Sequence, residues 1–198
     1  MTRLIIWRHA RTEWNATDRV QGQTDVDLDE AGVAQAAGSA PRVAAFSPDL
    51  IVSSDLRRAA RTAEALSAIT GLEVDHDARL RERNYGPWQG LRLVEIEQRY
   101  PDEYGRWRAG VPLRDPGIET VDDLAKRATA VMRDVAERVG DGTAVVVTHG
   151  GTARVGCAGL LGWPPSALHT LGGLGNCHHA DIRYTSTRGW QLRSYNAF

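Results

Sequence analysis

The chain of 198 residues has a formal net charge of −1. A protein of this size buries roughly 70% of the surface that its unfolded chain exposes, so it can build a core of its own. Nucleic-acid-binding proteins usually carry a basic excess, and the near-neutral balance argues against that class of partner. No apolar run approaches the length of a membrane span, so we expect no membrane segment. Because the first apolar run begins by residue 4, we also expect no signal peptide.

Cysteine use indicates the cellular compartment. Only Cys157 and Cys177 are present. Two cysteines in a chain of this length argue against a disulfide scaffold and for a reducing compartment. We therefore expect a cytoplasmic protein.

Short apolar runs alternate with helical patterns along the chain. Strands are expected at residues 4–7, 50–52, 72–74, 144–147, 180–185 and 190–195, helices at 29–45, 55–70, 119–139 and about 151–161, and a polar loop at 10–27. This alternation predicts an α/β protein, a three-layer α/β/α sandwich with a mostly parallel central sheet. We find no internal repeat or linker, so residues 1–198 are expected to form one domain.

The segment 83–118 is expected to be largely irregular, with weak helical character from 93 to 107. It contains a concentration of large rings, among them Trp88 and Trp107. We interpret this segment as an insertion that packs over the edge of the sheet and forms a lid over the active site.

Polar clusters follow three of the expected strands. They are Arg8-His9, the segment Ser53–Arg58 and the segment Thr148–Gly151. Because the carboxyl ends of parallel strands meet at one edge of a sheet, these clusters are expected to converge. Two histidines, several arginines and two helix N-termini around one point favour an anion as ligand. A neutral imidazole can attack an electrophile, so the pattern predicts chemistry on a phosphate.

Simpler explanations exist for each cluster taken alone. A single histidine after a strand more often caps or packs, and Gly150-Gly151 can simply ease a tight turn. The joint pattern favours one shared site over three independent explanations. The tripeptide Cys177-His178-His179 is not expected to bind a metal, because adjacent strand residues point to opposite faces.

The same motifs resemble, in order, those of the histidine phosphatase superfamily, also called phosphoglycerate mutase-like. The resemblance covers residues 4 to about 152, and Ala10 stands where the family usually has glycine. The matching segments are Arg8-His9-Ala10 with Thr12 and Asn15, then Arg19–Gly22, Ser53–Ala59 with Thr62, Leu80–Glu82 with Gly86–Gly90, and His149–Gly151.

The resemblance implies a phosphomonoesterase that forms a phosphohistidine and needs no metal or other cofactor. His9 is then the nucleophile, and Arg8, Arg58 and His149 grip the phosphate oxygens. Glu82 is the general acid and afterwards the general base. The resemblance also implies a substrate-binding set that includes Asn15, Gln21, Gly22, Tyr85 and Gly150.

The expected substrate is a small phosphorylated metabolite, such as a sugar phosphate or a phosphoglycerate derivative. The segment Gly172–Asn176 resembles phosphatases of this family that act on sugar-linked phosphoglycerate. A cofactor-dependent phosphoglycerate mutase is the alternative, because Glu82–Gly86 partly resembles a mutase segment, although the mutases' longer insertion is missing. A second alternative is an inactive phosphate- or phosphoprotein-binding module. The sequence is compatible with a homodimer and identifies no particular phosphate ester.

Overall fold

The central element of the computed structural model is one six-stranded sheet in the order β3-β2-β4-β1-β5-β6. The structure describes the backbone of residues 1–198 and every side chain except those of Pro165 and His169. Strands β1 to β4 pair in parallel, whereas β5 runs antiparallel to β1 and to β6. The expected mostly parallel sheet is therefore confirmed. The strands are β1 (Thr2–Arg8), β2 (Leu50–Ser53), β3 (Val74–His76), β4 (Thr143–Thr148), β5 (His179–Thr185) and β6 (Gly189–Ala197).

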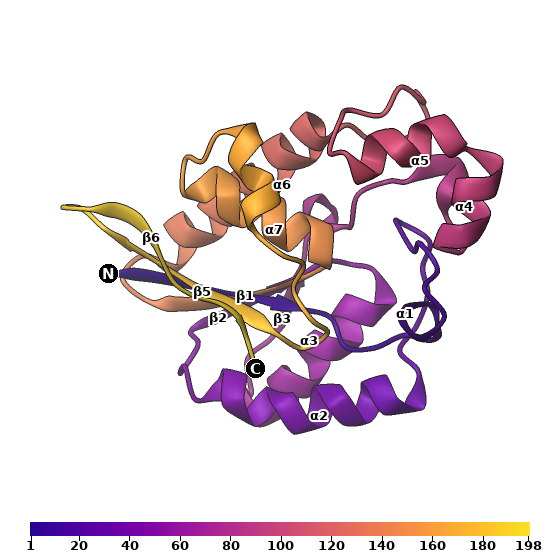
Figure 1. The fold of residues 1–198 in the computed structure, drawn as a ribbon. Helices are drawn as coiled ribbons and strands as arrows, with labels where there is room; N and C mark the ends of the chain where they lie inside the picture. Colours follow the sequence, from indigo (N-terminus) through magenta and orange to yellow (C-terminus); the bar gives the residue numbers. More distant parts are fainter.

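Helices cover both faces of the sheet, which confirms the three-layer sandwich (Figure 1). Helices α2 and α3 lie on one face, and α6 and α7 lie on the other. Their bounds are Glu30–Ala44 for α2, Arg57–Thr70 for α3, Val121–Val139 for α6 and Gly150–Leu160 for α7. Short 3₁₀ helices occupy Ala78–Leu80, Gly86–Trp88 and Pro165–Thr170.

The core is divided by the sheet into two apolar layers. Because successive strand residues point to opposite faces, β1 sends Leu4 and Ile6 into the layer under α6 and α7. It sends Ile5 and Trp7 into the layer under α2 and α3. All four side chains are fully buried. Strand β1 is thereby fixed from both sides, and so is the residue that follows it.

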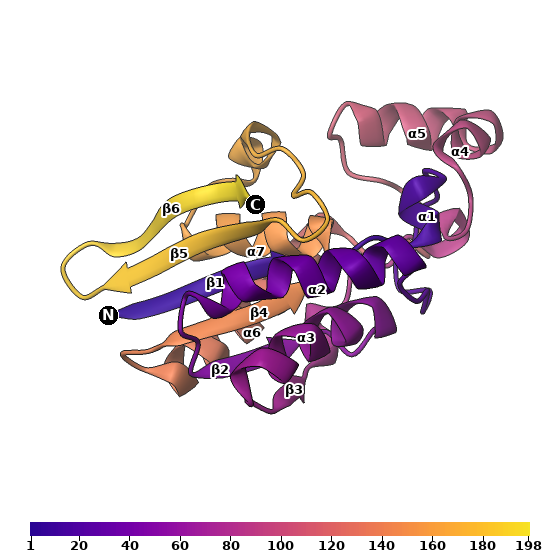
Figure 2. The same cartoon turned by 90° about the horizontal axis from the view of Figure 1, so that it is seen from below.

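Two further helices stand beyond the carboxyl end of the sheet (Figure 2). They are α4 (Leu93–Arg99) and α5 (Pro101–Arg108). Proline is tolerated in a first helical turn but not in a helix interior, which explains why the helical character expected over 93–107 divides at Pro101. Trp88 packs against Ile96 and joins this helix pair to the rest of the chain.

Two local expectations were wrong. Strand β3 lies two residues later than the expected 72–74, because Gly71 ends α3 in a left-handed conformation with φ of 73° and the chain needs the next residues to turn. The polar loop expected at 10–27 contains a short helix, α1 (Glu13–Ala16), which Thr12 caps. Within the described chain, no helix has both the length and the apolar character to cross a bilayer.

The layer under α2 and α3 provides a test of the packing. Leu66 of α3 is fully buried in that layer, while Ile69 of the same helix is 51% exposed. We expect Leu66→Ala to lower the free energy of unfolding by about 2–5 kcal/mol, since it removes buried methyl groups and leaves a cavity. Ile69→Ala should change it by less than about 0.5 kcal/mol. Urea titration of both variants measures the difference, and equal losses would contradict this packing.

Candidate active site

The carboxyl ends of β1 and β4 bring two histidines together. His9 follows β1 directly and His149 follows β4, and these strands are neighbours in the sheet. The two ring centroids lie 5.1 Å apart. Arg58, in the first turn of α3 after β2, donates from Nε to Nδ1 of His149 at 3.2 Å. The three polar clusters singled out in the sequence therefore meet at one point.

His9 is held as a neutral ring with one free nitrogen. Its Nδ1 lies 2.7 Å from the carbonyl oxygen of Ala10, which can only accept, so Nδ1 carries the proton and Nε2 keeps its lone pair. Burial lowers the pKa of His9 well below its usual value, and the neighbouring Arg58 and Arg8 lower it further. A neutral, oriented imidazole with a free Nε2 is the form that can attack an electrophile.

The tautomer of His149 is fixed in the opposite way. Its Nδ1 accepts from Arg58, which leaves the proton on Nε2, and that nitrogen donates to the Ser54 hydroxyl at 2.9 Å. Burial lowers the pKa of His149 well below its usual value, with Arg58 and His9 acting in the same direction. His149 is fully buried and neutral.

Two arginines supply the positive charge of the site. Arg8 donates to the carbonyl oxygen of Leu174, while its Nε is buried without a partner. Arg58 donates to the carbonyl oxygens of Gly22 and Thr24, and burial lowers its pKa to about 10. Buried cations normally have a paired carboxylate. Neither arginine forms an ion pair with a described carboxylate, and Glu82, which acts on both through space, offsets their charge only in part.

Glu82 lies at the N-terminus of α7. Its carboxylate accepts from the backbone nitrogens of Gly151 at 2.9 Å, Thr152 at 3.1 Å and Arg83 at 2.9 Å, and from the Thr152 hydroxyl. A β-carbon at position 151 would lie only 2.6 Å from Oε1 of Glu82. Glycine at this position is therefore what lets the carboxylate reach the helix end.

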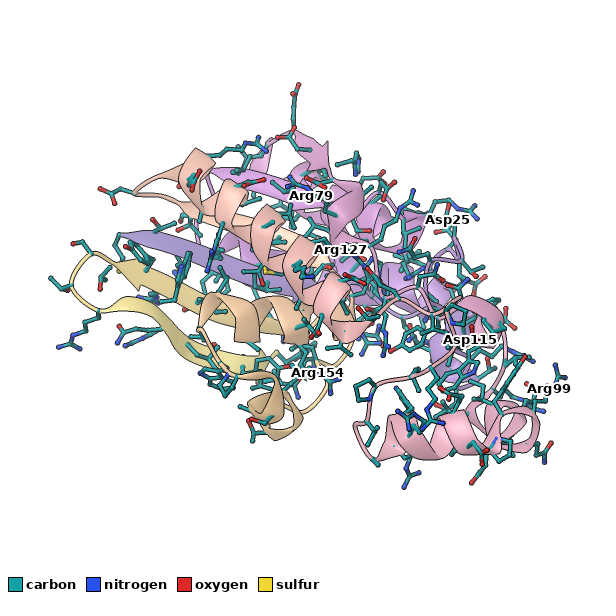
Figure 3. The ribbon with its side chains drawn as sticks, turned by 90° about the horizontal axis from the view of Figure 1, so that it is seen from above. Asp25, Arg79, Arg99, Asp115, Arg127 and Arg154 are labelled. Carbon is teal, nitrogen blue, oxygen red and sulfur yellow. The ribbon has the colours of Figure 1, made fainter. Side chains whose placement is uncertain are left out.

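A single arginine, Arg127, fixes the backbone that carries Glu82. Arg127 of α6 donates to the carbonyl oxygens of Arg79, Arg81 and Glu82, and forms a bidentate pair with Glu119 (Figure 3). The sequence reasoning missed Arg127 and Glu119. Their spacing of eight residues carries no motif, and their role depends on contacts across the fold.

Arg8, His9, Arg58 and Glu82 line a cavity of about 170 Å³. His149 and Gly150 do not line it, because the His149 ring is fully covered. Of the ten residues expected from the sequence, eight line the cavity: Arg8, His9, Asn15, Gln21, Gly22, Arg58, Glu82 and Tyr85. The sequence reasoning did not assign the remaining lining residues, which are Arg19, Val20, Trp88, Leu93 and Trp107.

Asn15 and Asn176 are held in place by local hydrogen bonds. The Asn15 side-chain oxygen accepts from the Thr12 backbone and hydroxyl, which completes the capping box of α1. Asn176, which the sequence reasoning placed only in a resembling tail segment, donates to the carbonyl oxygen of His9 at 2.9 Å. Gln21 lies close by, and its side-chain oxygen is buried without a partner.

Ala10 stands outside the cavity. Its methyl group is fully buried in the apolar layer under α2 and α3, and its backbone nitrogen donates to the Thr62 hydroxyl at 3.0 Å. The departure from glycine therefore adds core packing and leaves the site open. Among the described side chains, no three or more histidine, cysteine or acidic groups come together in a way that could hold a metal ion.

The two buried histidines make stability depend on pH. Both have a pKa well below 6.5 in the folded protein, whereas the unfolded chain has the usual value. The unfolded state therefore binds more protons below about pH 6.5, and the free energy of unfolding should fall as the pH decreases from 6.5 to 4.5. Each histidine contributes up to about 1.4 kcal/mol per pH unit.

Urea titrations across this range, in buffer free of phosphate and sulfate, measure the slope. His179, whose pKa burial also lowers, adds to the slope in the same direction and serves as the internal reference. The double variant His9→Asn/His149→Asn should show a clearly smaller slope. An unchanged slope would mean that these two rings are not buried in their neutral form.

Comparison with known proteins supports this geometry. The sequence profile of the histidine phosphatase superfamily (branch 1) matches residues 4–197. The chain is 40% identical to glucosyl-3-phosphoglycerate phosphatase of Mycolicibacterium vanbaalenii, over 98% of this chain and 94% of that protein. A probable phosphoglycerate mutase of Salmonella choleraesuis is 33% identical over 98% of this chain and 92% of that one.

A solved structure of mycobacterial glucosyl-3-phosphoglycerate phosphatase, in complex with VO3, superposes with a TM-score of 0.93 and 36% identity, and each chain is covered completely. Similarity of this extent in both sequence and fold leaves no part of the chain unmatched. The chain belongs to the histidine phosphatase superfamily (branch 1).

Proposed function

We propose that this phosphatase hydrolyses a phosphate monoester of a small metabolite through a phosphohistidine on His9. The observation that carries the proposal is the free Nε2 of a neutral His9 beside the buried Arg58 and the half-buried Arg8, neither of which has a paired counter-charge. A phosphoryl group supplies that counter-charge. It also places an electrophilic phosphorus next to the free nitrogen.

In the first step His9 Nε2 forms a bond to phosphorus while the bond from phosphorus to the ester oxygen breaks. Glu82 gives its proton to the departing oxygen, so the product leaves as an alcohol. In the second step a water molecule gives a proton to Glu82 and its oxygen attacks phosphorus. The bond from phosphorus to His9 then breaks, and inorganic phosphate leaves with His9 and Glu82 restored.

Arg8 and Arg58 stabilise the negative charge on the transferring group. The Nε of Arg8 has no partner within the protein, and Arg58 lines the same cavity against His149. His149 contributes through Arg58, since its Nδ1 accepts from Arg58 Nε and so holds that guanidinium in place. The N-terminus of α7 adds a positive dipole end at the same place. No step in this sequence requires a metal ion.

The proposed substrate class follows from the more similar relatives. The relative at 40% identity is named a glucosyl-3-phosphoglycerate phosphatase, and the mutase-named relative is at 33%. We therefore favour a sugar-linked phosphoglycerate as substrate and hydrolysis over isomerisation. The same proposal includes a lid role for residues 83–118. Trp107 of α5 lines the cavity around His9, which is called the phosphate cavity from here on.

The cytoplasm is the compartment that we propose for this enzyme. Cys157 and Cys177 are both buried and unpaired. Buried thiols without a disulfide partner are typical of a reducing environment.

The covalent intermediate can be tested with His9→Ala. A substrate labelled with ³²P should label the wild-type protein in a form that is stable to base and labile to acid. His9→Ala should show no label and a loss of turnover of at least about 10⁴-fold, because no other free imidazole nitrogen faces the cavity among the described residues. His178→Ala, which changes a histidine outside the cavity, is the control. Label that persists in His9→Ala would refute the assignment.

Hydrolysis, isomerisation and simple binding give different products. With 3-phosphoglycerate and chelator present, we expect free phosphate to be released without 2-phosphoglycerate. A mutase would return the phosphoryl group to the glycerate, and an inactive binding module would produce neither product. Activity that disappears when chelator is added would contradict the metal-free mechanism.

The position of the Glu82 carboxylate can be tested at Gly151. A methyl group there would lie 2.6 Å from Oε1, so Gly151→Ala should displace Glu82 and lower kcat by about 100-fold. The loss should be smaller for substrates with a good leaving group such as p-nitrophenolate, which need less proton donation. Gly38→Ala in α2, where a β-carbon meets nothing within 4 Å, is the control. A full rate in Gly151→Ala would contradict the role of this helix end.

A further inference from the structure

A second and larger cavity adjoins the phosphate cavity. It has a volume of about 500 Å³ and shares Tyr85 and Trp107 with the smaller one. Gly151, whose backbone nitrogen donates to Glu82, also lines it. A group that leaves the phosphorus atom beside Glu82 can therefore extend into this second space. Its size is within the range of small-molecule binding sites.

Two arginines that line this cavity have no carboxylate partner, unlike most arginines of the chain. Most arginines of the chain either pair with a carboxylate or are exposed to solvent. Among the described side chains, four arginines are buried or half-buried and have no carboxylate within 4.0 Å: Arg8, Arg58, Arg83 and Arg154. The first two line the phosphate cavity, and the other two line the second one.

Arg154 lies on α7, three residues after Gly151 and so on the same side of the helix. Figure 3 labels it at the side of α7 nearer to α5. Its Nε is buried and has no hydrogen-bond partner, which is also the state of Arg8 Nε in the phosphate cavity. A buried donor without a partner is costly, so a ligand that accepts from it is favoured.

Arg83 approaches the same space from the loop that carries Glu82. Its guanidinium lies 5.3 Å from the centre of the Tyr85 ring, and its Nε donates to the carbonyl oxygen of Glu119. Burial raises the pKa of the Tyr85 phenol, Glu82 acts in the same direction, and Arg83 and Arg154 oppose them. Both guanidinium groups thus act on one phenol between the two cavities.

From this geometry, and resting on the proposed phosphatase function, we infer that the second cavity binds the leaving group of the substrate and that Arg154 and Arg83 bind a carboxylate on it. Arginine donors match the two oxygens of a carboxylate. The apolar walls at Leu124, Val155 and Leu168 strengthen such a pair by excluding water. The cavity's one acidic lining residue among those described, Asp122, is exposed and leaves this charge uncompensated.

Two phosphate esters that differ only in this carboxylate test the inference. They are 3-phosphoglycerate and glycerol 3-phosphate, in which a hydroxymethyl group replaces the carboxylate. We expect the wild-type enzyme to favour 3-phosphoglycerate in kcat/KM. Arg154→Gln should reduce that preference by about 10-fold to 100-fold, the effect of losing a charge-assisted hydrogen bond. The loss in kcat/KM should be larger for 3-phosphoglycerate than for glycerol 3-phosphate.

Arg154→Lys keeps the charge but not the planar donor pair, and should recover part of the preference. Arg99→Gln is the matched control, because Arg99 is an exposed arginine on α4 that lines neither cavity. Arg83→Lys tests the second arginine with less risk to the fold than a neutral residue. A preference that is unchanged in Arg154→Gln and in Arg83→Lys would overturn the inference.

A binding measurement separates this subsite from the proposed reaction. Calorimetry with D-glycerate, in the presence of saturating inorganic phosphate, should show binding to the wild-type protein and at least about 10-fold weaker binding to Arg154→Gln. Loss of this difference refutes the carboxylate subsite even if the phosphatase activity is intact. Conversely, glycerate binding without hydrolysis of any phosphate ester would refute the proposed function and leave the subsite standing.

Discussion

The site depends on the burial of positive charge that no ion pair within the protein neutralises. The half-buried Arg8 and the fully buried Arg58 lie beside the buried rings of His9 and His149. Such an arrangement costs free energy in the empty protein, because desolvated cations repel one another and Glu82 compensates them only in part. Both histidines respond by staying neutral. The same repulsion that destabilises the free site therefore keeps the nucleophile unprotonated and makes a dianionic phosphoryl group the favoured ligand.

The fold tolerates this cost because rigid elements hold each member of the site. His9 follows a strand that is packed on both faces, and Arg58 is anchored by the carbonyl oxygens of Gly22 and Thr24. Glu82 has no such strand beneath it. Its position is set by the N-terminus of α7 and by Arg127. Arg127 donates hydrogen bonds to the carbonyl oxygens of the loop that carries Glu82. The acid is thereby tied to both helices on one face of the sheet.

The sequence allowed the convergence of His9, Arg58 and His149 to be predicted, because the carboxyl ends of parallel strands must share an edge. Tautomers could not be predicted in this way. The proton on Nδ1 of His9 and the proton on Nε2 of His149 depend on partners that only the three-dimensional contacts reveal, namely a carbonyl oxygen and the Ser54 hydroxyl. Arg127 was missed for the same reason, since its partners lie up to 48 residues away.

Ala10 shows that the effect of a methyl group beside the site depends on the surroundings into which it packs. The family usually has glycine at position 10, where this chain carries a methyl group directly after His9. In the structure that methyl group lies in the apolar layer under α2 and α3, and the Ala10 backbone nitrogen donates to the Thr62 hydroxyl. The adjacent His9 side chain lines the cavity instead. The nucleophile and a core residue can therefore be neighbours in sequence without competing for the same space.

The two cavities together explain why α4 and α5 lie beyond the sheet edge. Trp107 of α5 and Tyr85 line both spaces. A phosphate site built only from strand ends would hold the phosphoryl group and leave the rest of the ester in water. The ring-rich segment supplies walls for that remaining part. Selectivity among phosphate esters then belongs to this segment and to Arg154, while the sheet edge supplies the chemistry common to all of them.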